Sequence, residues 1–213
     1  MSDLAIVVAG GDAPPAGRAI PPHASVIAAD GGLDHVYALG LRVDLLVGDL
    51  DSVSASALAR ARSEGVTIDH HAAAKDETDL ELALDHVCAQ GVTRALVLGA
   101  GGGGRLDHAL GNLLLLASER YASIELDAWI GEATVSVVRV HRRFSLRAGD
   151  VVSLFAVGAP AFGVTTHGLE YPLHHEMLSP GSSRGISNVV LDGPIMVEVA
   201  DGVLLAVQLP APE

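Results

Sequence analysis

Four apolar runs of this chain each end in acidic residues flanked by glycine or hydroxyl residues. The four segments read Ala29-Asp30-Gly31-Gly32, Gly48-Asp49-Leu50-Asp51-Ser52, Lys75-Asp76-Glu77-Thr78-Asp79 and Gly103-Gly104-Arg105-Leu106-Asp107-His108. If the apolar runs are strands of a parallel α/β sheet, their carboxyl ends share one edge, where ligands bind. Carboxylates gathered there repel each other unless a cation neutralises them, and Mg²⁺ favours carboxylate oxygens together with substrate phosphates. The pattern therefore predicts a metal–phosphate site.

The segment around Asp49 and Asp51 carries the sharpest local signal. Two acidic residues at i and i+2 directly after a strand can both turn back toward the sheet edge and reach one cation. Gly48 permits close approach of the backbone, and we expect Ser52 to cap the following helix. The alternative interpretation is a helix-capping aspartate beside a solvated one.

The third segment combines carboxylates with a cation. Asp76 and Asp79 are three residues apart at the start of a predicted helix, so we expect them to share one helix face. Asp76 or Thr78 can cap that helix. Lys75 and Arg105 are the positive partners expected beside phosphates, lysine as a compact charge and arginine as a bidentate donor.

A run of four glycines, residues 101–104, lies between a predicted strand and a predicted helix. Glycine N–H groups can approach a phosphate chain closely, and the N-terminus of the next helix favours an anion. The position directly before Arg105 and Asp107 favours a phosphate-binding loop over the alternative, a flexible surface loop.

The elements that position these residues follow from the apolar patterns. Short apolar runs alternate with helical periodicity in the first part of the chain, which is typical of βαβ units. Strands are predicted at 4–9, 25–29, 45–47, 66–68, 94–98 and 124–130, and helices at 54–63 and 107–118. A further helix carries the stripe Leu80, Ala83, Leu84, Val87 and Cys88 and ends at Gly91.

The pattern changes after residue 131, where short β-rich runs are separated by turn signals. Strands are predicted there at 134–140, 151–157, 163–166, 186–190, 195–199 and 203–209. The expected fold is therefore α/β, with a Rossmann-like parallel-sheet domain over residues 1–132 and a small all-β sandwich domain over residues 133–213.

Composition excludes several classes of function. The formal net charge is −13 and no basic stripe exists, which argues against nucleic-acid binding. No stretch approaches about 18 consecutive apolar residues, so no membrane-spanning helix is expected. Cys88 is the only cysteine, which excludes an internal disulfide and suits a reducing cytoplasm.

The four acidic segments resemble, in order and spacing, the motifs of the thiamine pyrophosphokinase (thiamine diphosphokinase) family. Val164-Thr165-Thr166-His167-Gly168-Leu169-Glu170-Tyr171-Pro172-Leu173 and Gly185-Ile186-Ser187-Asn188 resemble that family's second-domain signatures. The resemblance implies an N-terminal domain that binds ATP and Mg²⁺, a β-sandwich that helps to bind thiamine, and a homodimer with active sites at its interface. The implied reaction is attack of the thiamine hydroxyl on the β-phosphorus of ATP, giving thiamine diphosphate and AMP.

The resemblance also implies roles for individual residues. Asp49 and Asp51 would be the main Mg²⁺ ligands, with Asp76 and Asp79 as further ligands and Asp30 in support. Arg105 and Lys75 would hold the polyphosphate, and Asp107 would position metal or nucleotide or accept the proton of the alcohol. The remaining residues implied to bind nucleotide and metal are Gly31, Thr78, Gly103, Gly104 and His108. Ser187 and Asn188 would hydrogen-bond the pyrimidine of thiamine, and Tyr171, where the family often has Trp, would pack against it.

Three other functions remain as alternatives. A haloacid-dehalogenase-type phosphatase also has an Asp-x-Asp motif, but usually after its first strand and without the glycine–Arg–Asp loop. A pyrophosphokinase acting on a pterin alcohol would use the same first-domain chemistry. A non-catalytic nucleotide or thiamine sensor would give no purpose to so many metal-binding carboxylates.

Overall fold

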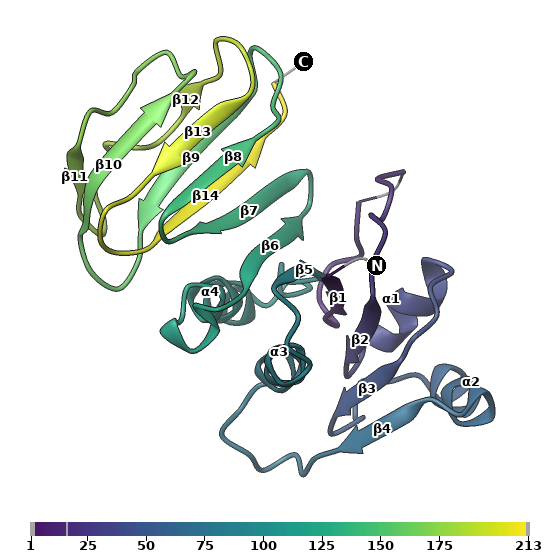
Figure 1. Cartoon of the computed structure of the whole chain (residues 1–213). Helices are drawn as coiled ribbons and strands as arrows, with labels where there is room; N and C mark the ends of the chain where they lie inside the picture. The colour runs from purple at the N-terminus through teal and green to yellow at the C-terminus, as the bar shows by residue number, and fades with distance from the viewer. Residues whose placement is uncertain (1–2, 16, 212–213) are drawn as a thin grey trace. The chain divides into compact units, whose positions relative to one another are not determined.

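The computed structural model describes residues 3–15 and 17–211 and divides the chain into two units, Met1–Gly131 and Glu132–Glu213. Helices and strands alternate in the first unit, whereas the described part of the second unit contains strands and no helix (Figure 1). The predicted α/β class with a second β unit is confirmed. The chain combines parallel and antiparallel strands.

A parallel sheet forms the centre of the first unit. In spatial order its strands are β6 (Glu125–Ile130), β5 (Arg94–Leu98), β1 (Leu4–Val8), β2 (Ser25–Ala29), β3 (Leu45–Gly48) and β4 (Thr67–His70). Every neighbouring pair is parallel. All five residues of β1 are buried, because helices cover both faces and the strand therefore reads as a continuous apolar run.

Four helices flank this sheet. Figure 1 shows α1 (Gly32–Ala38) and α2 (Ala55–Glu64) on one face, with α3 (Asp79–Ala89) and α4 (Leu106–Leu116) on the other. The core under α1 and α2 includes Ile6, Leu33 and Leu46. A 3₁₀ turn, η1 (Glu119–Tyr121), follows α4.

The helix starts differ in part from the expected ones. Ser54, and not Ser52, caps α2 by accepting a hydrogen bond from the N–H of Ala57. Thr78 caps α3, so Asp76 precedes the helix and does not share a helix face with Asp79. Helix α1 was not predicted, since it is short and begins at two glycines without a side-chain cap.

The second unit is built from two groups of antiparallel strands. The first group has the order β12 (Asn188–Val189), β9 (Val151–Ala156), β14 (Leu204–Leu209) and β7 (Ala133–Val138). The second has the order β11 (Glu176–Leu178), β10 (Ala161–His167), β13 (Ile195–Glu198) and β8 (His141–Phe144). Buried residues of both groups form one core, among them Leu154 of β9, Val164 of β10 and Leu204 of β14.

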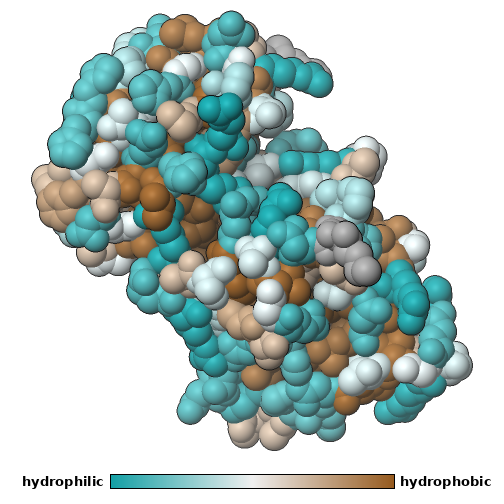
Figure 2. Space-filling view, in the orientation of Figure 1, coloured by the Kyte–Doolittle hydropathy of each residue, from teal (hydrophilic) through white to brown (hydrophobic). Residues whose placement is uncertain are grey.

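Strands β8 and β11 were not predicted, because each is short and lacks a continuous apolar run. The predicted strand at 186–190 is reduced to the two residues of β12. On the face drawn in Figure 2, hydrophilic side chains are interspersed with hydrophobic ones. Within the described residues, no helix has both the length and the hydropathy needed to cross a membrane.

Candidate functional site

The first unit contains a pocket of about 500 Å³ at the carboxyl ends of its strands. The segments that follow β1, β2, β3 and β5 line this pocket, together with the start of α3. Its lining residues are Ala9, Gly10, Ala29, Asp30, Gly31, Asp49, Asp51, Ser52, Thr78, Asp79, Leu80, Gly102, Gly103, Arg105, His108 and Asn112. The four acidic segments therefore meet at one edge of the sheet, as the strand pattern predicts.

Three carboxylates of this pocket converge. One oxygen from each of Asp30, Asp49 and Asp79 lies within 4.8 Å of the other two. Asp30 directly follows β2, Asp49 directly follows β3, and Asp79 is the first residue of α3. Like charges at this separation disfavour ionisation unless a cation neutralises them. We refer to these three residues as the acidic cluster.

Asp30 has the most constrained environment in the acidic cluster. The residue is 7% exposed, and its Oδ1 atom is buried without a hydrogen-bond partner. Burial raises the pKa of Asp30, and the negative charges of Asp79 and Asp49 raise it further. Its backbone has a φ of 47°, and its N–H donates to the carbonyl of Val47. A buried carboxylate oxygen without a donor, facing two other carboxylates, fits the oxygen-rich coordination that Mg²⁺ requires.

Gly48 allows the three carboxylates to come together. Its φ is 142°, a conformation that favours glycine. A Cβ at this position would lie 3.0 Å from both the Cβ of Asp30 and the Oδ1 of Asp79. The absence of a side chain at residue 48 is therefore a steric requirement of the acidic cluster.

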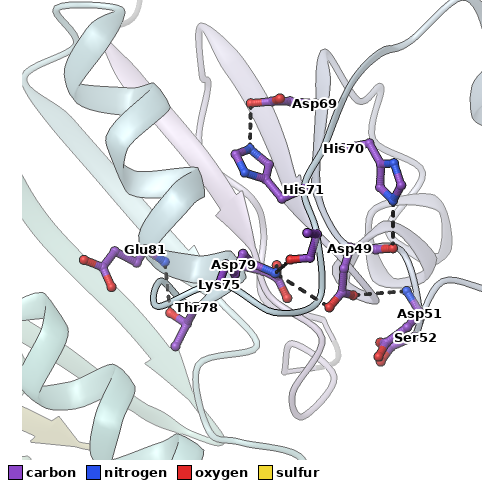
Figure 3. Close-up of polar contacts among 11 residues, drawn as sticks. Asp49, Asp51, Ser52, Asp69, His70, His71, Lys75, Thr78, Asp79 and Glu81 are labelled. Carbon is purple, nitrogen blue, oxygen red and sulfur yellow. Dashed lines mark hydrogen bonds and ion pairs between the residues drawn. The ribbon is translucent and has the colours of Figure 1, made fainter.

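Among the ion pairs of the described residues, the one formed by Lys75 brings a positive charge directly against the acidic cluster. Its Nζ lies 3.0 Å from Asp79 Oδ1 and 3.6 Å from Asp49 Oδ2. Figure 3 shows the ammonium pointing toward both carboxylates from the segment before α3. Burial lowers the pKa of Lys75, but Asp79 and Asp49 more than offset this, so its pKa is raised and the ammonium stays charged.

Asp51 and Asp76 lie outside the acidic cluster. Asp51 lines the same pocket but is exposed, and its N–H donates to Asp49 Oδ1 at 3.2 Å while its own Oδ1 accepts from Ser52. Asp76 is exposed and is not part of the pocket lining. The sequence analysis expected Asp51 and Asp76 to lie with Asp49 and Asp79 as metal ligands. In the structure, Asp30 is the residue that lies with those two.

Glycines form one wall of the pocket. A Cβ at Gly11 would lie 2.2 Å from the carbonyl oxygen of Gly99, and one at Gly102 would lie 2.3 Å from that of Arg105. At Gly11, the loops after β1 and β5 therefore approach each other too closely for a side chain, and at Gly102 the loop after β5 lies too close to the start of α4 for one. Gly103 also lines the pocket, whereas Gly104 is exposed and outside the lining.

The start of α4 carries the remaining polar groups. Arg105 donates to both oxygens of Asp107, at 3.0 and 2.6 Å, and this contact lowers the pKa of Asp107 to about 2. A carboxylate with so low a pKa is a weak proton acceptor. Asp107 lies outside this pocket's lining, but His108 and Asn112 belong to it from the same helix face.

The second unit has a smaller pocket of about 220 Å³ that includes Tyr171 and Asn188. Tyr171 is 66% exposed. The Asn188 amide accepts a hydrogen bond from the N–H of Tyr171 at 3.0 Å and donates to its carbonyl at 2.7 Å. Ser187 lies outside this lining, with a φ of 58° and its N–H donating to Ser153 Oγ. Asn188 thus holds the backbone that presents Tyr171.

Sequence reasoning missed several pocket residues. Gly10 lies two residues after the end of β1, and a glycine so near a strand end is a signal of the same kind as the one that identified Asp30. Asn112 is four residues after His108 on α4, so helical spacing could have identified it. Ala9, Ala29 and Leu80 carry no chemical signal.

Two family models match this chain. The model described as "Thiamin pyrophosphokinase, catalytic domain" matches residues 18–127, and the model described as "Thiamin pyrophosphokinase, vitamin B1 binding domain" matches residues 137–204. The first match covers the predicted acidic segments and most of the first unit. The second lies within the second unit.

Curated relatives show the same similarity over most of their length. Thiamine pyrophosphokinase 1 of Arabidopsis thaliana is 27% identical over 209 residues, covering 86% of this chain and 77% of the relative. Thiamine pyrophosphokinase of Bacillus subtilis (strain 168) is 26% identical over 164 residues, covering 76% of each.

Solved structures show the same fold. The crystal structure of thiamine pyrophosphokinase from Bacillus subtilis matches with a TM-score of 0.86 at 23% identity, covering 98% of this chain and all of that one (100%). Thiamin pyrophosphokinase from Candida albicans matches with a TM-score of 0.77 at 15% identity, covering 97% and 90%.

Proposed function

The chain belongs to the thiamin pyrophosphokinase family of enzymes, and we propose that the pocket of its first unit performs the diphosphoryl transfer. In this reaction the hydroxyl oxygen of thiamine bonds to the β-phosphorus of ATP. The bond between that phosphorus and the oxygen bridging to the α-phosphorus breaks, and AMP leaves with the bridging oxygen. The first unit, near residues 1–132, would bind ATP as a Rossmann-like domain, and the second, near residues 133–213, would bind thiamine.

The observation that carries this proposal is the buried Asp30 carboxylate beside Asp49 and Asp79. We assign these three residues to hold Mg²⁺, with Asp51 in reach at the rim of the pocket. When bound, Mg²⁺ neutralises charge on the phosphate oxygens and so helps both attack and departure. Asp76 is exposed before α3 and is assigned only to the surrounding charge.

The other polar groups of the pocket would hold the phosphate chain in line. We assign the backbone N–H groups of Gly102 and Gly103 to phosphate oxygens, and the start of α4 adds a favourable dipole. The N–H of Gly31 instead hydrogen-bonds the Asp30 carboxylate at the wall of the pocket. Thr78 and His108 are further donors in the lining. Arg105 would contact phosphate while Asp107 orients its guanidinium, and Gly104 gives that loop its freedom to turn. Alignment of the reacting groups, together with neutralisation of the phosphate charge, supplies most of the rate acceleration in such transfers.

The pocket of the second unit supports a role in thiamine recognition. Tyr171 offers an exposed aromatic face, which suits a cationic heteroaromatic ligand. We assign Tyr171 to pack against thiamine, Asn188 to hold Tyr171 in place, and Ser187 to hydrogen-bond the pyrimidine.

We also propose that the active protein is a homodimer with its active sites at the interface between protomers. Three leucines on α4 support this proposal, because Leu106, Leu110 and Leu114 follow one another at every fourth residue and are 72%, 54% and 60% exposed. An apolar stripe of this kind is typical of a surface that another protein covers. The cytoplasmic location expected from the single cysteine stays a prediction.

The decisive experiment is a product analysis with the purified protein, ATP, Mg²⁺ and thiamine. We expect AMP and thiamine diphosphate in equal amounts, because attack at the β-phosphorus moves both terminal phosphates together. ADP with thiamine monophosphate would rule out this reaction. Turnover of a pterin alcohol in place of thiamine would favour the alternative pyrophosphokinase, which uses the same chemistry in the first unit. Binding of ATP and thiamine without turnover would favour a non-catalytic sensor.

A further inference from the structure

The ammonium that contacts the acidic cluster belongs to the only lysine of the chain. Twelve of the 13 basic residues are arginines, and the remaining one is Lys75. Its side chain is only 13% exposed, which is unusual for a lysine. The ammonium has three oxygen neighbours: Asp79 Oδ1 at 3.0 Å, Asp49 Oδ2 at 3.6 Å and the carbonyl of Ala72 at 3.4 Å.

These contacts overlap with those required of a metal site. Two of the three carboxylates in the acidic cluster already contact Lys75. The Oδ1 atom of Asp79, which contacts the ammonium, is buried. Mg²⁺ binds oxygens at about 2.0–2.1 Å in strict octahedral geometry. An ammonium in contact with the same carboxylates opposes a divalent cation both by repulsion and by occupying space.

A lysine at residue 75 suits a contact with carboxylates that must break when a metal ion binds. Lysine is a point charge on a flexible four-carbon stem, whereas arginine holds carboxylates in a bidentate fork. Lys75 also stands in the segment between β4 and α3, where its backbone is not part of a helix or strand. The ammonium can therefore leave the carboxylates by rotation of its side chain, without loss of regular structure.

We propose that Lys75 is an internal counter-cation of the acidic cluster that a divalent cation displaces, which frees the ammonium to contact the substrate phosphates. This inference rests on the proposed metal site and adds an order of events to it. In the metal-free protein, Lys75 relieves the repulsion among the three carboxylates. On metal binding, the same charge moves to the phosphate side of the pocket, so metal binding and phosphate binding are coupled.

The single lysine makes a direct test possible. Protein labelled with ¹⁵N-lysine has one side-chain ammonium to observe, that of Lys75. Without metal, we expect an Nζ resonance protected from rapid hydrogen exchange by its three oxygen neighbours. Saturation with Mg²⁺ should shift this resonance and abolish the protection. A resonance that keeps its position and its protection at saturating Mg²⁺ would show that Lys75 stays in place, and would overturn the inference.

Metal affinity provides the second test, without any substrate. Mn²⁺ binding is measured by electron paramagnetic resonance for wild type, for Lys75→Met, and for Arg94→Met. Arg94 is a matched control: its side chain is 50% exposed, its ion pairs are long, and it lies at the start of β5, away from the pocket. We expect Lys75→Met to bind Mn²⁺ about tenfold more tightly or better, because an opposing unit charge at contact distance is removed. Arg94→Met should bind as wild type does.

The outcomes separate this inference from the proposed function. Asp49→Asn, which removes a proposed metal ligand, serves as the control for the metal site. Equal Mn²⁺ affinity in wild type and Lys75→Met, with weakened Mn²⁺ binding in Asp49→Asn, would refute the role of Lys75 and leave the metal site intact. Absence of Mn²⁺ binding in wild type and in Lys75→Met, with an unchanged Nζ resonance, would refute the metal site itself. Thermal unfolding in EDTA checks that Lys75→Met is folded, and the resonance test on wild type does not depend on that variant.

Discussion

At the scale of single residues, the acidic cluster lowers the stability of the metal-free protein. Asp30 is buried, its Oδ1 atom has no hydrogen-bond partner, and two more carboxylates lie within 4.8 Å. A buried carboxylate oxygen without a hydrogen-bond partner costs free energy in the folded state. Lys75 offsets part of this cost through its contacts with Asp49 and Asp79. The arrangement therefore does not stabilise the metal-free fold, which agrees with the proposed cation site.

Asp30→Asn should stabilise the metal-free protein. The pKa of Asp30 is raised in the folded protein. As the pH rises above the ordinary pKa of an aspartate, ionisation of Asp30 therefore favours the unfolded chain and lowers the free energy of unfolding. A neutral amide at residue 30 removes this effect at neutral pH. We therefore expect a rise in Tm, at about 2–4 °C for each kcal/mol of stability gained by a chain of this size. Thermal unfolding in EDTA measures it, and a lower Tm than wild type would contradict it.

The same variant should lose activity and metal binding. Addition of Mn²⁺ should raise the Tm of wild type and have little effect on Asp30→Asn, because the variant lacks one of the three negative ligands. Equal metal-induced stabilisation in both proteins would remove Asp30 from the metal site.

Asp107→Asn tests whether Asp107 is the catalytic base. Arg105 lowers the pKa of this carboxyl to about 2, which makes it a weak acceptor for the thiamine proton. We expect kcat to stay within about tenfold of wild type, since loss of a true general base costs about 10²–10⁴. The acid limb of the pH profile of kcat should also remain. If kcat fell more than a hundredfold and the acid limb of its pH profile disappeared, Asp107 would be identified as the base.

At the scale of elements, the pocket is made from strand ends and helix starts. The strand ends of β2 and β3 deliver Asp30 and Asp49, while the first residue of α3 delivers Asp79. Rigid elements hold these positions, and glycine-rich loops fill the space between them without side chains. Helix α4 has two roles, because one face carries His108 and Asn112 to the pocket while another exposes leucines.

Leu110→Glu should weaken the proposed homodimer. A charge at the centre of an apolar interface must be buried without a partner. We expect the dimer dissociation constant to rise about thirtyfold or more, the effect of losing an interface residue worth about 2 kcal/mol. Light scattering over a range of protein concentrations measures this change. Ala59→Glu places the same charge on an exposed position of α2 and should leave the mass unchanged. An unchanged dimer in Leu110→Glu would exclude α4 from the interface.

At the scale of the whole molecule, the proposed labour is divided between the two units. The acidic cluster, Lys75 and the glycine loops belong to the first unit, and the aromatic pocket around Tyr171 belongs to the second. Phosphate handling and thiamine recognition should therefore respond separately to mutation.

Tyr171→Ala should raise the KM for thiamine and leave that for ATP within twofold or so of wild type. Loss of aromatic stacking costs about 1–3 kcal/mol per base, equivalent to a several-fold to hundredfold change. Steady-state kinetics with each substrate varied in turn gives both constants. Phe162→Ala removes another exposed aromatic of the second unit, outside that pocket, and serves as the control. Equal changes in both KM values would argue for general destabilisation instead of lost contact.

Much of the fold was accessible from the sequence because its signals are local. The strands of the parallel sheet are continuous apolar runs, and the stripe on α3 repeats with helical periodicity. Helix α1 and strands β8 and β11 escaped prediction, because their residues form these elements only through contacts with neighbouring elements.

The sequence by itself determined that acidic residues follow strands and that those strand ends share an edge, because strand direction in a parallel sheet dictates where each end lies. Only the tertiary structure decided which carboxylates converge. The place of Asp30 beside Asp49 depends on the register of β2 against β3. Asp79 joins them because Thr78 caps α3, so that Asp79, and not Asp76, is the residue at the start of the helix. The contact of Lys75 with two of these carboxylates depends on the path of the segment before α3. Such paths result from packing among distant residues, which no local pattern of the chain encodes.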